Sequence, residues 1–157
     1  MFNKDTMKAT GKVDIIIRDA EGRIKDERHI TNTVVDTGLD FIAQRMKDTL
    51  GGHTLPDEMS HMEVGEGTTA ASINDTVIES ALSPQARVAL TTAGGTVTDN
   101  SIAYVATFGA GTGTGALTEA GVFNDSSVGT MLCRTVFSVI NKGAADSMTI
   151  TWTITIS

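Results

Sequence analysis

The segment SMTITWTITIS, residues 147–157, alternates apolar and polar side chains without interruption. Successive side chains of a β-strand point to opposite faces, so the apolar members of this segment share one face. Only serine and threonine occupy the other face. The pattern predicts a half-buried strand that lays its apolar face on the core.

Other segments upstream have strand patterns. Residues 101–108 place Ile102, Tyr104, Ala106 and Phe108 on one face, which predicts a second strand. Apart from Arg134, Thr135 and Ser138, residues 131–140 are apolar on both faces, as in a central strand. The turn residues 19–22 lie between two strand-like runs and predict a hairpin. Shorter strands are expected at 59–64, 87–92 and 117–123.

One segment has a convincing helical pattern. Asp36 and Thr37 can cap a helix that runs to Leu50, and Gly51-Gly52 can end it. Its apolar residues fall on one side, namely Leu39, Ile42, Ala43, Met46 and Leu50. Residues 75–82 are compatible with one or two further helical turns.

Short strands separated by turn signals predict a mostly β fold, a β-sandwich of jelly-roll or immunoglobulin-like type with one helix near 36–50. We expect a single domain over 11–157, preceded by an N-terminal arm over 1–10. The predicted core is Val13, Ile15, Ile17, Leu39, Ile42, Val88, Tyr104, Phe108, Val136, Ile150, Trp152 and Ile154.

Composition limits the classes of function. The 157 residues are 40% hydrophobic and 20% charged, as in a globular chain, and they contain neither a membrane-length apolar run nor an apolar N-terminal signal. We therefore expect a soluble protein made in the cytoplasm. A net charge of −7 argues against partners that are nucleic acids or anionic membranes.

The charge is unevenly distributed along the chain. Residues 1–50 carry nine basic and nine acidic residues, whereas residues 51–157 carry three and ten. The second part is instead rich in the small uncharged residues Thr, Ser, Gly and Ala. Its surface is either ordinary solvated surface or a surface that meets other protein, because interface cores are depleted in charge.

The glycine-rich run at 109–116 contains Gly111-x-Gly113-x-x-Ala116, a formal variant of the dinucleotide fingerprint. That site needs a helix whose N-terminal amides hold the pyrophosphate. The following residues are too short and too glycine-containing for such a helix, so we interpret the run as a strand connection.

Several loop and strand residues are possible ligands for a cation, but their spacing along the chain matches no familiar ligand set. The possible donors are His53, Asp57, Glu58, His61, Glu63 and Glu66.

Seven methionines are many for this chain, and Met46, Met59 and Met62 either fill core gaps or line a docking surface.

The single cysteine, Cys133, lies in the most apolar strand and is expected to be a buried thiol, with no disulfide framework possible. The chain has no nucleophile elbow, Walker loop or H-E-x-x-H motif. We therefore expect no enzyme activity, no catalytic, cofactor-binding or metal-binding residues, and no cofactor.

Several runs resemble a known class of proteins. These are MSHMEVGEGTTA (59–70), ARVAL (86–90), YVATFGAGTGTGALTEAGVFN (104–124), RTVFSVINKGA (134–144) and SMTITWTITIS (147–157). Together they resemble small β-rich structural proteins of tailed bacteriophage virions, either capsid decoration (cement) proteins or tail-fibre-like proteins. The similarity covers most of residues 12–157 and implies no active-site residues.

The resemblance implies a virion protein assembled in the host cytoplasm. Its expected partners are the major capsid protein and copies of itself, in a homotrimer. A capsid decoration protein on the outside of the head is favoured, because the chain has neither the heptads nor the β-helical repeats of a fibre shaft. A tail component remains the alternative, and a carbohydrate-binding module is a more remote one.

Overall fold

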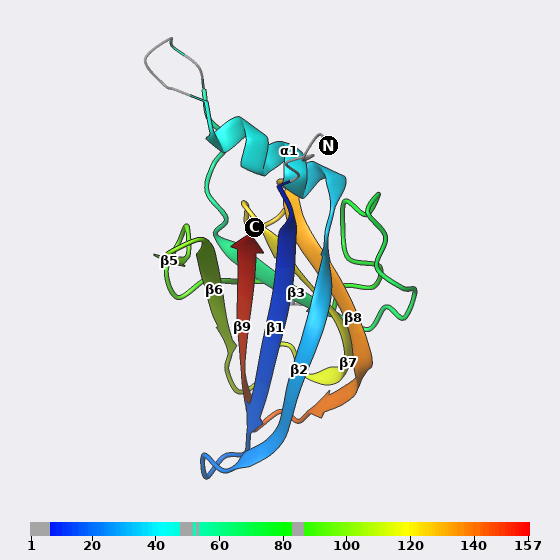
Figure 1. Ribbon diagram of the computed structural model, residues 1–157. Helices are drawn as coiled ribbons and strands as arrows, with labels where there is room; N and C mark the ends of the chain where they lie inside the picture. Colours follow the sequence, from blue (N-terminus) through cyan, green and yellow to red (C-terminus); the bar gives the residue numbers. More distant parts are fainter. Residues whose placement is uncertain (1–6, 48–51, 53, 83–86) are drawn as a thin grey trace, which may run out of the picture.

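The computed structural model describes residues 7–47, 52, 54–82 and 87–157. This part of the chain forms nine strands and one short helix (Figure 1). In chain order the elements are β1 (Ala9–Arg18), β2 (Ile24–Val34), α1 (Asp36–Arg45), β3 (His61–Gly65), β4 (Arg87–Ala89), β5 (Thr96–Thr98), β6 (Ser101–Phe108), β7 (Gly115–Phe123), β8 (Met131–Lys142) and β9 (Ser147–Ile156).

The strands form one curled antiparallel sheet in the order β4-β3-β7-β8-β2-β1-β9-β6-β5. The mostly β class is confirmed, but two separate sheets of a sandwich are not. The reason lies in β2, which pairs with β1 along most of its length and with β8 through Thr33 and Val34. This shared strand joins the two halves of the sheet into a half-barrel. The two halves also meet where the amide of Thr91, two residues after β4, donates to the carbonyl of Val105 in β6 at 2.8 Å.

Strand β9 lies at the centre of one half of the sheet, between β1 and β6 (Figure 1). Its residue Trp152 is opposite Val13 on one side and Tyr104 on the other. The apolar face of β9 is buried, so the strand predicted at 147–157 and its orientation are confirmed.

Most of the predicted core is buried, namely Val13, Ile15, Ile17, Tyr104, Phe108, Ile150, Trp152 and Ile154. Ile42 and Val88 pack partly buried against this core, and Val136 is half-buried. Leu39 was predicted wrongly, because 41% of it is exposed.

The helix is shorter than predicted and presents a different face to the sheet. It ends at Arg45, while residues 48–51 of the expected helical segment lie outside the described residues. Gly38 and Phe41 are its buried residues, whereas Met46, just beyond its end, is 72% exposed. The expected cap is also absent, because the Thr37 hydroxyl donates to the Met131 carbonyl at 2.9 Å instead.

Gly38 explains this orientation. A Cβ atom at this position would lie 2.0 Å from the Leu132 carbonyl oxygen, so only glycine lets α1 approach β8 this closely. An alanine in a helix usually stabilises it relative to glycine. Here we expect Gly38→Ala to lower the free energy of unfolding by about 1 to 3 kcal/mol, because backbone must move apart.

Urea denaturation measures this change. The exposed Asp40→Ala on the same helix is the control, with an expected change within about 0.5 kcal/mol. A Gly38→Ala protein as stable as the control would show that the close helix–strand contact does not constrain the fold.

In three further segments the structure differs from what the sequence predicted or adds to it. Residues 75–82 contain bends and one isolated bridge at Ala81 rather than helix. The edge strand β5 was not predicted. Of the expected arm over 1–10, residues 1–6 lie outside the described residues, and Ala9 and Thr10 belong to β1. Lys8 exchanges two backbone hydrogen bonds with Ser157, at 2.7 and 2.9 Å.

Candidate functional site

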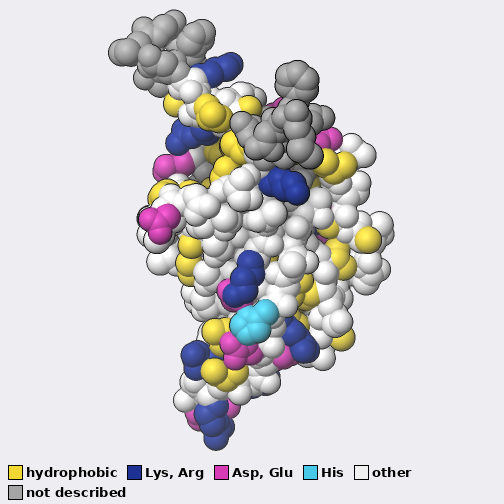
Figure 2. Space-filling model, in the orientation of Figure 1, with side chains coloured by type: hydrophobic (Ala, Val, Ile, Leu, Met, Phe, Trp, Pro, Cys, Tyr) yellow, Lys and Arg dark blue, Asp and Glu magenta, His cyan; other side chains and the backbone are white. Residues whose placement is uncertain are grey.

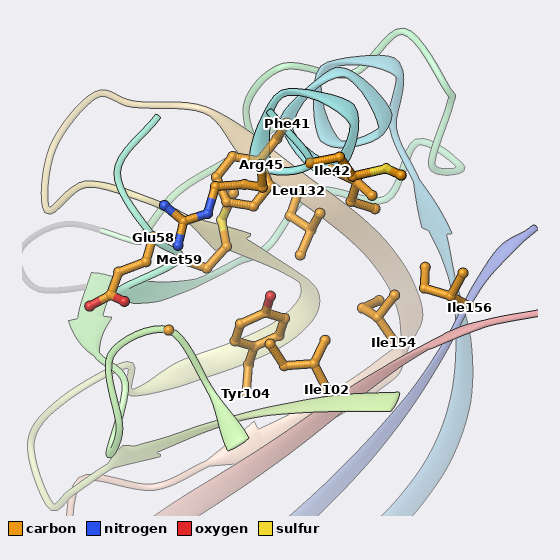
Figure 3. A pocket seen from close by; sticks show the side chains of 12 residues that line it. Phe41, Ile42, Arg45, Glu58, Met59, Ile102, Tyr104, Leu132, Ile154 and Ile156 are labelled. Carbon is orange, nitrogen blue, oxygen red and sulfur yellow. The ribbon is translucent and has the colours of Figure 1, made fainter. Parts of the chain in front are cut away.

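A pocket of about 350 Å³ lies between α1 and one end of the curled sheet (Figure 3). The helix contributes Phe41, Ile42 and Arg45 to its wall. Strand β6 contributes Ile102 and Tyr104. The rest of the wall comes from β8, β9 and the segment before β3, through Leu132, Ile154, Ile156, Glu58 and Met59, with Met46 and Gly94 completing it.

The pocket has a polar side and an apolar side. In Figure 3, Arg45, Glu58 and Met59 lie on one side, and Ile154 and Ile156 lie on the other. The Tyr104 hydroxyl points into the space between them (Figure 3). An apolar hollow with a few convergent polar groups is the usual form of a site that binds a small molecule or a single side chain.

The polar groups have defined surroundings. Arg45 donates from Nη1 to the Pro56 carbonyl at 3.1 Å, and its guanidinium carbon lies 6.0 Å from the centre of the Phe41 ring. Burial raises the pKa of Tyr104 to about 12. Its hydroxyl, like that of any tyrosine at neutral pH, is protonated and can donate a hydrogen bond.

A second polar centre, which we call the Arg134 cluster, comprises Arg134, Glu119, Asp75 and Glu79. Arg134 donates to Glu119 from Nε and Nη2 at 3.0 and 2.9 Å, and its Nη1 donates to Asp75 at 2.7 Å. The side chain of Glu119 is fully buried and that of Arg134 is 3% exposed. Although burial opposes its charge, the bonds to Asp75 and Glu119 raise the pKa of Arg134.

The Arg134 cluster ties the loop after β3 to the sheet. Glu119 also accepts hydrogen bonds from the amides of Gly67, Glu79 and Ser80, at 2.9, 2.9 and 2.6 Å. Arg134 donates to the Thr69 carbonyl at 3.2 Å. Every oxygen of the buried carboxylate therefore has donors, and the arrangement holds a loop rather than presenting a reactive group.

The residues considered for a cation site do not converge. Glu63 accepts from Arg87 at 2.6 Å, Glu66 accepts from the Ala116 amide at 3.2 Å, and the His61 ring lies 2.8 Å from the Ser60 hydroxyl. Glu58 faces the pocket, and His53 lies outside the described residues. Within the described ranges, no three His, Cys, Asp or Glu side chains form a group that could hold a metal ion.

The glycine-rich run leads into a strand. Gly111 and Gly113 have φ angles of 76° and 57°, which glycine adopts without strain, and β7 begins at Gly115. No helix N-terminus therefore follows this turn, in agreement with its interpretation as a strand connection.

The thiol of Cys133 is buried, as predicted, and burial raises its pKa well above the ordinary value. A protonated, inaccessible thiol is a poor nucleophile. Met59 and Met62 are core residues, as the gap-filling interpretation predicts, whereas Met46 is exposed at the pocket.

Asp146, in the turn before β9, makes part of the stability depend on pH. It accepts a hydrogen bond from Lys25, and a second from the Gly143 amide at 2.8 Å. The Lys25 bond and then the Gly143 bond lower the pKa of Asp146 below its ordinary value of 3.8. The stability that this carboxylate contributes is therefore present above pH 3.8 and is lost as the pH falls through the lower folded-state pKa.

We expect Asp146→Asn to be less stable than the natural chain at pH 7 but to lose less stability between about pH 5 and pH 2. Urea denaturation across that range measures the difference, with the exposed Asp40→Asn as the charge-matched control. If both variants lose stability with the same slope, Asp146 is not the group responsible.

Neither the pocket nor the Arg134 cluster was predicted from the sequence. For the cluster a signal existed, since Arg134 and Glu119 are charged residues whose neighbours on either side within their strands are apolar or small. The pocket had no such signal, because its wall comes from six separate segments.

Comparisons of the chain with protein-family models, curated proteins and solved structures find no match. In the described part of the chain, no helix has the length and apolar character needed to cross a membrane.

Proposed function

We propose that this protein is a structural component of a tailed-bacteriophage virion, most simply a decoration protein that binds the outer surface of the head and stabilises it. Its partners would be the major capsid protein and two further copies of itself. The resemblance of its strand segments to such proteins supports the proposal, as does a body built from one continuous sheet around one main core.

The distribution of surface charge is the observation that carries the proposal. In Figure 2, charged side chains gather at the end formed by the β1–β2 hairpin and also occur around the opposite, helical end, whereas much of the visible face between the two ends is uncharged. Aliphatic side chains are exposed elsewhere, including Val97 on the edge strand β5, at 68%, and Val128 in the β7–β8 turn, at 77%. Low charge with exposed aliphatic groups is typical of surface that meets protein.

A tail component is the alternative location, and copy number separates the two. We expect hundreds of copies per purified particle, measured by quantitative mass spectrometry against the major capsid protein, because a shell repeats its lattice sites many times. A count near six, twelve or eighteen would instead place the protein in the tail. Absence from purified particles would contradict a virion role altogether.

The described aromatic side chains do not favour carbohydrate binding. Phe41, Phe108, Phe123, Phe137, Tyr104 and Trp152 are all buried, with at most 8% exposed. Sugars stack on exposed aromatic rings in such binding sites, and the described residues present no exposed aromatic ring. We therefore do not propose a carbohydrate-binding module.

A further inference from the structure

We infer that the pocket beneath α1 binds a small amphipathic carboxylate, with its aliphatic chain against the isoleucines and its carboxylate between Arg45 and Tyr104. The resemblance to virion proteins implies no ligand for this chain. The inference stands on the pocket alone and does not depend on the proposed function.

The size and lining of the pocket define the body of the ligand. Its volume is about 350 Å³, more than twice that of the ~150 Å³ cavity that accepts benzene in an engineered protein. Ile102, Ile154 and Ile156 line the side away from Arg45, and Ile42 and Leu132 add to the apolar lining beneath the helix. A flexible aliphatic chain of about eight to twelve carbons suits this irregular apolar surface.

The polar side of the pocket defines the head group. A guanidinium has five N–H donors, and the Pro56 carbonyl takes one of those on Arg45. The protonated Tyr104 hydroxyl offers another donor in the space between Arg45 and the isoleucines. A cationic donor on the Glu58 side of the pocket and a neutral hydroxyl donor inside it match a carboxylate head group, because charge-assisted hydrogen bonds are the stronger ones.

Glu58 lines the same side of the pocket as Arg45, so its charge bears on which head group binds there. Its carboxylate repels a bound anion, so removing its charge should tighten the binding of a carboxylate. An alkylamine would show the opposite dependence, with weaker binding after the same change. Glu58→Gln therefore distinguishes the two kinds of head group.

The test is a titration of the full chain with alkyl carboxylates from hexanoate to tetradecanoate, each below its micelle concentration. Trp152 is the only tryptophan and lies opposite Tyr104, so its fluorescence reports on the pocket, and calorimetry gives the stoichiometry. We expect one saturable site, with affinity rising about fourfold per methylene until the chain fills the pocket.

The variants identify the site. We expect Arg45→Gln to weaken decanoate binding about tenfold while leaving decanol binding unchanged, and Tyr104→Phe to weaken decanoate binding about threefold. Glu58→Gln should tighten it. Arg28→Gln, which removes an exposed arginine of β2, is the matched control and should change nothing.

Circular dichroism confirms that each variant is folded, which is expected because Arg45 and Glu58 are exposed and Tyr104→Phe keeps the ring. The inference is overturned if no chain length binds saturably. Equal effects of Arg45→Gln and Arg28→Gln, or tighter binding of decylamine than of decanoate, would overturn it as well.

Discussion

Replacing Arg134 by alanine is expected to lower the free energy of unfolding by about 3 to 5 kcal/mol. The change would leave the fully buried carboxylate of Glu119 without its cationic partner. The three amides that also donate to Glu119 cannot supply a positive charge. The same change would release the Thr69 carbonyl and Asp75, so the loop after β3 should become locally mobile.

An exposed ion pair on β2 is the matched control. Arg28 donates to Asp26 at 2.9 Å, but their side chains are 42% and 29% exposed. Because water screens such a pair, Arg28→Ala should cost no more than about 1 kcal/mol. Urea denaturation compares the variants, and hydrogen exchange of the amides of Gly67 and Ser80 reports on the loop.

A double-mutant cycle then isolates the pair. Arg134→Ala leaves the buried Glu119 without a cation, whereas Glu119→Ala leaves Arg134 with Asp75 as its acceptor at 2.7 Å. Because both single variants break the same buried ion pair, the double variant should lose less stability than the sum of the two single losses. Additive losses, or a loss from Arg134→Ala no larger than that from Arg28→Ala, would show that the Arg134 cluster does not behave as a buried ionic unit.

Replacing Trp152 by alanine is expected to cost about 3 to 5 kcal/mol as well, for a different reason. Its ring is fully buried at the centre of β9, between Val13 and Tyr104 on the neighbouring strands. Truncation removes the largest side chain of the core and leaves a cavity that surrounding strands cannot fill without breaking their hydrogen-bonded register.

Trp152→Phe separates packing from hydrogen bonding. The indole Nε1 is buried without a hydrogen-bond partner among the described residues, so losing its N–H should cost nothing. We expect Trp152→Phe to lose less than half as much stability as Trp152→Ala. Circular dichroism follows both variants, which lack the tryptophan signal. Equal losses would show that the indole makes a hydrogen bond, for example through buried water.

The strands could be predicted because their signal is local. The alternation at 147–157 lies in eleven consecutive residues, and the buried face of β9 follows from side-chain geometry alone. Alternation does not specify which strands pair, so it could not distinguish a sandwich from the half-barrel. That distinction depends on β2, whose last residues, Thr33 and Val34, bond to β8.

The helix shows where local reasoning fails. Its apolar residues indicated a face containing Leu39 and Met46, but the buried face contains Gly38 and Phe41. Glycine adds nothing to an apolar pattern, yet its missing side chain allows the backbone of α1 to contact the Leu132 carbonyl. Close approach of two backbones is a tertiary constraint that hydrophobic periodicity does not contain.

The sequence by itself determined the β class, the main strands, most of the core and the burial of Cys133, because each follows from the period and polarity of neighbouring residues. The tertiary structure alone decided the curl of the sheet, the orientation of α1, the Arg134 cluster and the pocket. Arg134 is fifteen residues from Glu119 and fifty-nine from Asp75 along the chain, and the pocket gathers residues from Phe41 to Ile156. Such contacts depend on strand order and curvature, which no local pattern encodes.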